Sequence, residues 1–119
     1  MLVVDDYADT REMYAEFLSF AGFSVAEAAT GEAAITEARK LKPAAVVMDL
    51  SLPGMTGWEA AAVLRRERGN ALPIIAVTAS LDPSFRDAAL AAGCDVFLRK
   101  PVAPKTLAAE IGRLLRAAC

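Results

Sequence analysis

Short apolar runs alternate with longer amphipathic stretches along the chain, and glycine, proline or aspartate residues separate them. This alternation predicts strands in the apolar runs and helices in the amphipathic stretches. Most of the runs are continuously apolar, which is typical of strands buried on both faces of a parallel sheet. The predicted strands lie at about residues 2–4, 25–28, 44–48, 74–77 and 96–98.

The amphipathic stretches carry start and stop signals of helices. The first predicted helix begins near Asp9, which has capping-box spacing to Glu12, and it ends before Gly22. Its predicted apolar stripe consists of Met13, Phe17 and Phe20. Further helices are expected at about residues 30–41, 58–68, 84–92 and 104–117. Gly93 is a stop signal after the fourth of them, and Pro104 suits the first position of the fifth.

Alternating strands and helices of this kind predict an α/β fold. Parallel crossovers are right-handed and place helices on both faces of the sheet. We therefore expect a doubly wound, flavodoxin-like (βα)5 sandwich with a parallel sheet in the order 2-1-3-4-5. The length of 119 residues suits one domain spanning residues 1–119, with no output domain in this chain.

Composition narrows the possible partners and surroundings. The 13 basic and 15 acidic residues give a net charge of −2, which disfavours direct binding to nucleic acid or to an anionic membrane. The apolar runs are shorter than the roughly 18 to 20 residues that span a bilayer, and no signal peptide opens the chain, so a cytoplasmic protein is expected. Cys94 and Cys119 form no CxxC pair, and we expect both to be reduced thiols.

Chemically distinctive residues follow four of the predicted strands. In an open parallel sheet, ligands bind beyond the carboxyl ends of the strands, near the point where strand order reverses. Three clustered carboxylates repel one another unless a cation neutralises them, and Mg²⁺ prefers such oxygen ligands and often bridges them to a phosphate. A lysine and a hydroxyl would then contact the phosphoryl oxygens. The residues expected to converge are Asp5, Asp6, Asp49, Thr78 and Lys100.

The chain contains no histidine, which removes the most common general base. Phosphoryl transfer depends mainly on alignment and charge neutralisation, so a carboxylate, a divalent cation and a lysine are sufficient. An ionised aspartate needs no deprotonation before it attacks. Asp49, central in the predicted cluster, is the expected nucleophile.

Each of these residues has an ordinary structural explanation when it is taken alone. Asp5 and Asp6 could form a solvated turn, and Asp49 could cap the turn that follows it. Thr78 could be a strand residue and Lys100 a surface charge beside a proline. The functional interpretation rests on their combination at successive strand ends of one small fold.

The chain resembles the response-regulator receiver domains of two-component signalling from Leu2 to the last predicted helix. The segments that carry the resemblance are residues 2–6 (LVVDD), 48–57 (MDLSLPGMTG), 77–79 (VTA) and 92–101 (AGCDVFLRKP). Two positions depart from the usual pattern. Thr56 stands where many members have aspartate, and Tyr7 stands where a polar residue is common.

The resemblance implies a role for each site residue. Asp49 would accept a phosphoryl group from a phosphohistidine of a sensor histidine kinase or a histidine phosphotransfer protein. Asp6 and Asp49 would bind Mg²⁺ directly, and Asp5 would bind it through water. The backbone carbonyl of Ser51 would be a further metal ligand. Lys100 would pair with the phosphoryl group, and the Lys100–Pro101 bond would be cis.

The resemblance also implies a switch and a signalling role. Thr78 would move onto the phosphoryl oxygen, and Phe97 would turn inward, which would reshape the face of the fourth helix, fifth strand and fifth helix. Phe97 has no hydroxyl, so an outward rotamer would only expose an apolar ring. The protein would promote its own phosphorylation and dephosphorylation without being a turnover enzyme. Its output would pass to a downstream protein or to an output domain outside this chain.

Three alternatives make different predictions. A phosphatase of the haloacid-dehalogenase type needs a second aspartate two residues after the first, where this chain has Ser51. A flavodoxin-like FMN carrier needs a phosphate loop rich in Ser, Thr or Gly after the first strand, whereas the acidic residues here would repel a phosphate. A degenerate receiver that acts only as an interaction module would lack some of the residues needed for phosphorylation.

Overall fold

The computed structural model describes residues 1–117 and shows strands and helices in regular alternation. The strands are β1 (Leu2–Val4), β2 (Ala26–Ala28), β3 (Val46–Asp49), β4 (Ile74–Thr78) and β5 (Val96–Arg99). The helices are α1 (Ala8–Phe20), α2 (Gly31–Leu41), α3 (Gly57–Arg68), α4 (Pro83–Ala91) and α5 (Pro104–Ala117), with a short 3₁₀ helix η1 (Gly69–Ala71). The predicted elements are therefore confirmed, with shifts of one or two residues at their ends.

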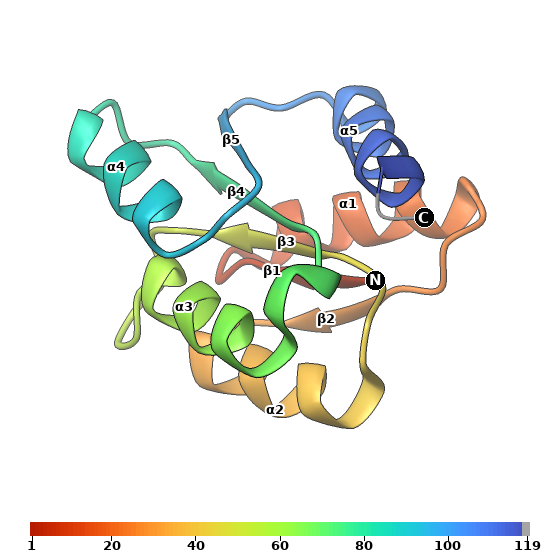
Figure 1. Cartoon of the computed structure of the whole chain (residues 1–119). Helices are drawn as coiled ribbons and strands as arrows, with labels where there is room; N and C mark the ends of the chain where they lie inside the picture. The colour runs from red at the N-terminus through yellow and green to blue at the C-terminus, as the bar shows by residue number, and fades with distance from the viewer. Residues whose placement is uncertain (118–119) are drawn as a thin grey trace.

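The five strands form one parallel sheet in the order β2-β1-β3-β4-β5, as predicted (Figure 1). In the register of the sheet, Val4 pairs with Met48, Asp49 with Val77, and Thr78 with Arg99. The carboxyl ends of β1, β3, β4 and β5 consequently lie at the same edge. This edge is where the sequence predicts the functional residues.

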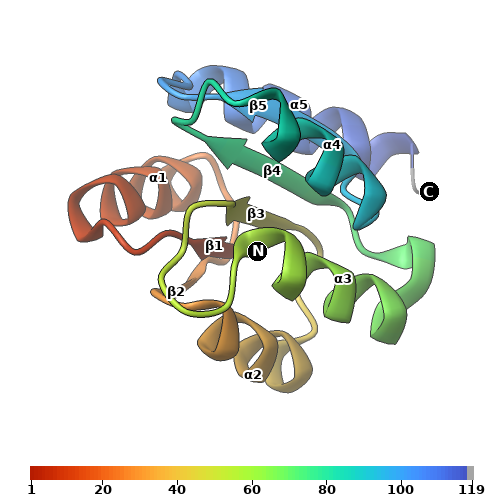
Figure 2. The same cartoon turned by 90° about the vertical axis from the view of Figure 1, so that its left-hand side faces the viewer.

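Side chains that alternate along the strands divide the core into two layers. Leu2 and Val4 pack in a cluster with residues of α2, α3 and α4, whereas Val3 packs in a second cluster with residues of α1 and α5. Helices thus cover both faces of the sheet, and Figure 2 shows α2 and α3 side by side on one of them. The fold class is confirmed.

Burial differs between the central and the edge strands. Every residue of β1, β3 and β4 is buried, as the continuous apolar runs predict. The expected burial on both faces is wrong for β2 and β5, because their residues are mostly half-buried or exposed. Both are the outermost strands of the sheet, so each has a neighbouring strand on one side only.

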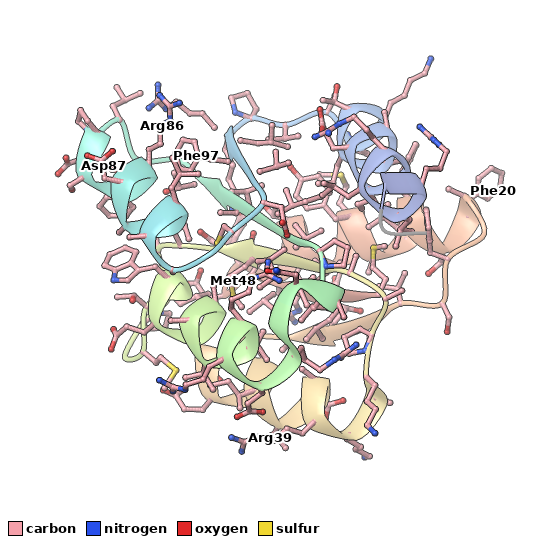
Figure 3. The ribbon with its side chains drawn as sticks, in the orientation of Figure 1. Phe20, Arg39, Met48, Arg86, Asp87 and Phe97 are labelled. Atoms are coloured by element: carbon pink, nitrogen blue, oxygen red, sulfur yellow. The ribbon has the colours of Figure 1, made fainter. Side chains whose placement is uncertain are left out.

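The start and the buried face of α1 differ from the prediction. The helix begins at Ala8 after the N-cap residue Tyr7, and no side chain caps it, so the predicted capping box at Asp9 is wrong. The connection from β1 is short, which places Asp9 inside the first turn. The predicted apolar stripe is also wrong in part, because Met13 is 42% exposed and Phe20 is 93% exposed. Figure 3 shows Phe20 projecting away from the end of α1.

Residues one position further along the chain form the buried face of α1. They are Tyr14, Ala15 and Leu18. The tyrosine and the leucine are four residues apart and therefore lie on one face of the helix. The hydrophobic periodicity identified the helix but placed its core face about one residue too early.

Helix boundaries elsewhere have clear local causes. Gly22 and Gly93 have φ angles of 105° and 97°, which glycine adopts readily, and they follow the ends of α1 and α4 as predicted. Pro104 is the first residue of α5, also as predicted. The capping box of α3, in which Thr56 and Glu59 exchange hydrogen bonds, was not predicted from the sequence.

Cys94 is buried and its thiol is free, in agreement with the expected reduced state. Cys119 lies outside the described residues. Among the described helices, none combines the length and the apolar character that crossing a membrane requires.

Candidate functional site

Three carboxylates meet at the carboxyl edge of the sheet. Asp5 directly follows β1, and Asp49 is the last residue of β3. Asp5 is 2% exposed and Asp49 is 4% exposed, whereas the side chain of Asp6 is open to solvent. One carboxylate oxygen from each of the three residues lies within 4.8 Å of the others. The structure therefore brings together the three acidic residues that the sequence predicts to converge.

Lys100 places a positive charge between the two buried carboxylates. Its Nζ donates hydrogen bonds to Asp5 Oδ2 at 2.7 Å and to Asp49 Oδ2 at 3.3 Å. The backbone N–H of Lys100 donates to the Thr78 carbonyl at 2.8 Å, which fixes the lysine at the end of the sheet. The peptide bond between Lys100 and Pro101 is cis.

Backbone amides orient the other oxygen of each buried carboxylate. Tyr7 N–H donates to Asp5 Oδ1 at 2.9 Å, and Ser51 N–H donates to Asp49 Oδ1 at 3.0 Å. In each case the donor lies two residues after the aspartate, a spacing typical of Asx turns. Both side chains are held in place by their own loops, and each turns its Oδ2 toward Lys100.

Asp49 and Lys100 influence each other's pKa. Burial raises the pKa of Asp49, although the Ser51 amide and the Lys100 charge oppose this effect. For Lys100, desolvation is the largest single influence and lowers the pKa, but the hydrogen bond to Asp5 and the charges of Asp49 and Asp5 together outweigh it. The pKa of Lys100 is therefore raised, and the lysine stays protonated at neutral pH.

A pair of hydroxyls lies beside the carboxylates. Thr78, the last residue of β4, is fully buried, and its Oγ1 lies 3.3 Å from Ser51 Oγ. The backbone N–H of Ser80 donates to Thr78 Oγ1 at 3.1 Å. The Thr78 hydroxyl is thus held near Asp49 through Ser51, the residue whose amide binds Asp49.

Gly57 lets α3 begin against the end of β3. A Cβ at this position would lie 2.1 Å from the Asp49 carbonyl oxygen and 2.6 Å from Leu50 Cα. The Gly57 N–H also donates to the Leu50 carbonyl at 3.1 Å. Only glycine allows this close approach. Gly57 belongs to the sequence motif quoted above, but its structural role becomes visible only in three dimensions.

Sequence reasoning also missed Arg11 and Tyr14, which support the site from α1. Arg11 donates from Nη1 to the Asp5 carbonyl at 3.0 Å and from Nε to Glu27 at 3.0 Å. The Tyr14 hydroxyl donates to the Val102 carbonyl at 2.8 Å. Neither residue belongs to a short motif, because both act across the fold, so no sequence signal could have identified their partners.

Phe97 lies on β5, close to α4. The side chain is half-buried and packs against the core cluster that contains Leu2, Val4 and residues of α2, α3 and α4. Together with Arg86, Leu90 and Arg99 it lines an open groove of about 480 Å³, and Figure 3 shows Phe97 and Arg86 close together beside α4.

The donor set suits a hard divalent cation. Asp5, Asp6 and Asp49 offer carboxylate oxygens within a few ångströms of one another, and one of the three residues faces solvent. Mg²⁺ favours oxygen ligands and keeps several of its waters. A partly open acidic site therefore suits Mg²⁺ better than a metal that prefers sulfur or nitrogen ligands.

Comparison with known proteins agrees with this geometry. The chain is 40% identical over 116 residues to the DNA-binding response regulator MtrA of Mycobacterium tuberculosis, an alignment that covers 98% of this chain and 50% of MtrA. It is 41% identical to the response regulator MprA of Mycolicibacterium vanbaalenii, with 98% and 50% covered. The chain thus spans about half the length of these relatives.

Solved structures show the same fold over nearly the whole chain. A CheY-like receiver domain protein from Methanospirillum hungatei superimposes with a TM-score of 0.94 at 27% identity, covering 98% of this chain and 93% of that one. The chemotaxis protein CheY4 of Vibrio cholerae gives a TM-score of 0.87 at 32% identity, covering 95% of each chain. The family model described as the response regulator receiver domain matches residues 1–112. The chain therefore belongs to the response-regulator receiver domain family, whose members serve as phosphoacceptors in two-component signalling.

Proposed function

We propose that Asp49 is the phosphoacceptor of this receiver and takes its phosphoryl group from a phosphohistidine. The donor would be a sensor histidine kinase or a histidine phosphotransfer protein. The observation that carries the proposal is the environment of the Asp49 carboxylate. It is buried, its pKa is raised by burial, and its Oδ2 lies 3.3 Å from the Lys100 ammonium.

The proposed reaction is a direct displacement at phosphorus. A carboxylate oxygen of Asp49 forms a P–O bond while the P–N bond to the donor imidazole breaks, and the imidazole takes up a proton from solvent. The products are an aspartyl phosphate and a neutral histidine. No general base is needed because the nucleophile is already ionised, which explains how a chain without histidine can accept the group.

Two side chains would stabilise the phosphoryl oxygens. Lys100 already reaches Asp49 and would donate to the phosphoryl group as charge develops on it. The Thr78 hydroxyl, held by Ser51, would donate to another of these oxygens after rotating away from Ser51. Preorganised donors of this kind contribute to phosphoryl transfer mainly by aligning the reactants and neutralising charge.

Asp5, Asp6, Asp49 and the Ser51 backbone carbonyl would hold Mg²⁺, directly or through water. When bound, the ion would neutralise charge shared between the carboxylates and the phosphoryl group. This role explains why three acidic residues are placed together at a site that must receive an anion.

A groove beside Lys100 provides access for the donor. It has a volume of about 350 Å³, and its walls come from α1 and from the segment that follows β5. An imidazole ring would lie against this largely apolar surface, beside the Lys100 side chain that also reaches Asp49. The residues lining the groove are Thr10, Met13, Tyr14, Ala79, Lys100, Pro101 and Val102.

Phosphorylation would switch the face made by α4, β5 and α5. Movement of Thr78 toward the phosphoryl group would open space beside β4 for the Phe97 ring. This movement would shift a two-state equilibrium that exists before phosphorylation. The altered face would signal to a downstream protein or output domain, and the DNA-binding regulators among the relatives illustrate one such output. The protein would not be a turnover enzyme on an external substrate.

Acetyl phosphate with Mg²⁺ tests the acceptor. We expect intact mass spectrometry to show one added phosphoryl group on the wild-type chain, and hydroxylamine to remove it. Asp49→Asn should gain nothing, whereas Asp9→Asn, the same change at an exposed position of α1, should behave as wild type. An adduct that persists on Asp49→Asn would assign the acceptor elsewhere.

Amide chemical shifts test the switch. Beryllofluoride, a stable mimic of the phosphoryl group, should move the signals of α4, β5 and α5 more than those of α2. The Thr78→Val variant should still bind the mimic but show smaller changes around Phe97. Equal changes in the wild type and in Thr78→Val would mean that Thr78 does not drive the switch.

A further inference from the structure

A buried hydrogen bond joins α1 to the connection between β5 and α5. The Tyr14 hydroxyl donates to the carbonyl oxygen of Val102 at 2.8 Å, across 88 positions of the sequence. Tyr14 is 3% exposed and Val102 is 8% exposed, so water competes little for this bond. A buried hydroxyl and a buried carbonyl are both costly to leave unpaired, and each therefore fixes the position of the other.

The segment from Lys100 to Val102 is consequently held at both ends. At its start, the Lys100 N–H donates to the Thr78 carbonyl at 2.8 Å, which belongs to the sheet. At its end, the Val102 carbonyl accepts from Tyr14. Pro101 between them has no N–H to donate, and its side chain is exposed. Tyr14 thus anchors the end of this segment that the bond to Thr78 does not hold.

Anchoring of this segment fixes the backbone position from which the Lys100 side chain extends. Its ammonium makes bonds of 2.7 Å and 3.3 Å to carboxylates from two different strand ends, and such a position tolerates little movement of the lysine backbone. Tyr14 also lies close enough for the charges of Lys100 and Asp5 to influence its pKa in opposite directions, although burial is the main cause that raises it. The phenol remains a neutral donor at physiological pH.

We propose that Tyr14 is a positioning residue for Lys100: its hydroxyl holds the segment after β5 against α1, so that the lysine ammonium stays between Asp5 and Asp49. The inference rests on the proposed function for its significance in phosphoryl transfer. The contacts that carry it, however, exist without a phosphoryl group. The competing explanation is that the Tyr14 ring only fills the core under α1 and that the hydroxyl has no effect on the lysine.

Amine acylation of Lys100 separates these explanations without using phosphoryl transfer. The wild-type protein is acylated in Mg²⁺-free buffer, and peptide mass spectrometry measures the rate at Lys100 relative to that at Lys40, an exposed residue of α2. Tyr14→Phe keeps the ring and removes the hydroxyl. Tyr7→Phe removes a hydroxyl from a side chain that is 62% exposed and serves as the matched control.

We expect Tyr14→Phe to raise the Lys100-to-Lys40 ratio by about three- to tenfold, the range that corresponds to losing one buried hydrogen bond. Tyr7→Phe should leave the ratio unchanged. If Tyr14→Phe is less stable, the ratio is measured at a lower temperature at which circular dichroism shows that the variant is folded, so that unfolded protein does not contribute to it. A purely structural role would lower the melting temperature and leave the ratio of the folded protein unchanged, and this result would overturn the proposal.

The rate of phosphorylation by acetyl phosphate completes the test. It should fall in Tyr14→Phe by a similar factor of about three to ten. A wild-type chain that gains no phosphoryl group would overturn the proposed function, whereas the acylation ratios would still decide whether Tyr14 positions Lys100. An unchanged phosphorylation rate together with a raised ratio would contradict a role of this positioning in phosphoryl transfer.

Discussion

Lys100 makes its shorter carboxylate bond with Asp5, at 2.7 Å, and its longer one with the proposed acceptor Asp49, at 3.3 Å. In this arrangement the lysine neutralises a residue that would also serve a metal ion. Lys100 and Mg²⁺ would therefore compete for Asp5, and the lysine would be free to turn toward a phosphoryl group once the metal is bound. This relationship would make the lysine a regulator of metal affinity as well as a ligand of the phosphoryl group.

Replacing Lys100 by methionine should reveal the competition. Two buried carboxylates would lose their cation, so the free energy of unfolding without metal should fall by about 3 kcal/mol. Mg²⁺ should then bind about tenfold more tightly than to the wild type, because the competing charge is gone. Thermal melts with and without Mg²⁺ measure both effects. Lys105→Met on the exposed side of α5 is the control, and weaker Mg²⁺ binding in Lys100→Met would contradict the competition.

The fold could be predicted from the sequence because its main determinants are local. Apolar runs such as residues 44–48 and stop signals such as Gly22 and Gly93 act over a few residues, so the sequence predicts strands and helix ends within one or two positions of those observed. The predicted buried face of α1 is wrong because Phe20 and Met13 have large apolar side chains, which are typical of core residues, yet both are exposed. Which apolar side chains face the core depends on the angle at which a helix packs, and this angle is not encoded locally.

The candidate site divides in the same way. Asp5, Asp49 and Lys100 could be predicted because each follows or ends a strand, and parallel strands bring their carboxyl ends together. The residues that hold this site in place could not be predicted from the sequence. The hydrogen bond from Tyr14 to Val102, for example, joins two segments that meet only in the folded chain.

Asp49→Asn should stabilise the protein in the absence of metal. Burial raises the pKa of Asp49, which means that the folded state disfavours its charged form at neutral pH. The neutral amide removes this penalty, so the variant should melt at a higher temperature than the wild type in EDTA. Added Mg²⁺ should stabilise the wild type and reduce the difference. A lower melting temperature of the variant in EDTA would show that the bond to Lys100 outweighs the cost of burial.

Gly57→Ala should damage the site by forcing α3 away from β3. The new Cβ would lie 2.1 Å from the Asp49 carbonyl oxygen, where backbone must move to admit it. We expect a loss of at least about 3 kcal/mol in the free energy of unfolding, measured with urea. Gly112→Ala in α5 is the matched control, since its Cβ would meet only the end of the flexible Arg116 side chain at 3.2 Å. The control should gain up to about 1 kcal/mol, and similar values for both variants would refute the close approach.

Acidification should weaken the start of α3. Hydrogen bonds from the Thr56 backbone N–H and hydroxyl lower the pKa of Glu59 below its ordinary value of 4.5. A carboxylate with a lowered folded-state pKa contributes stability above its unfolded-state pKa, and the contribution is lost as the pH falls through the folded-state pKa. In urea titrations below about pH 5, Glu59→Gln should therefore lose less stability than the wild type. Parallel curves for Glu59→Gln and the wild type would exclude the capping contribution.

Direct localisation of the phosphoryl group tests the central claim most sharply. Borohydride reduces an aspartyl phosphate to homoserine, which peptide mass spectrometry can assign to a single position. After phosphorylation by a histidine phosphotransfer protein in the presence of Mg²⁺, we predict homoserine at position 49 and aspartate retained at positions 5 and 6. Homoserine at the position of another aspartate would contradict the assignment of Asp49 as the acceptor. The same holds if the donor transfers its phosphoryl group to this chain and no homoserine is found.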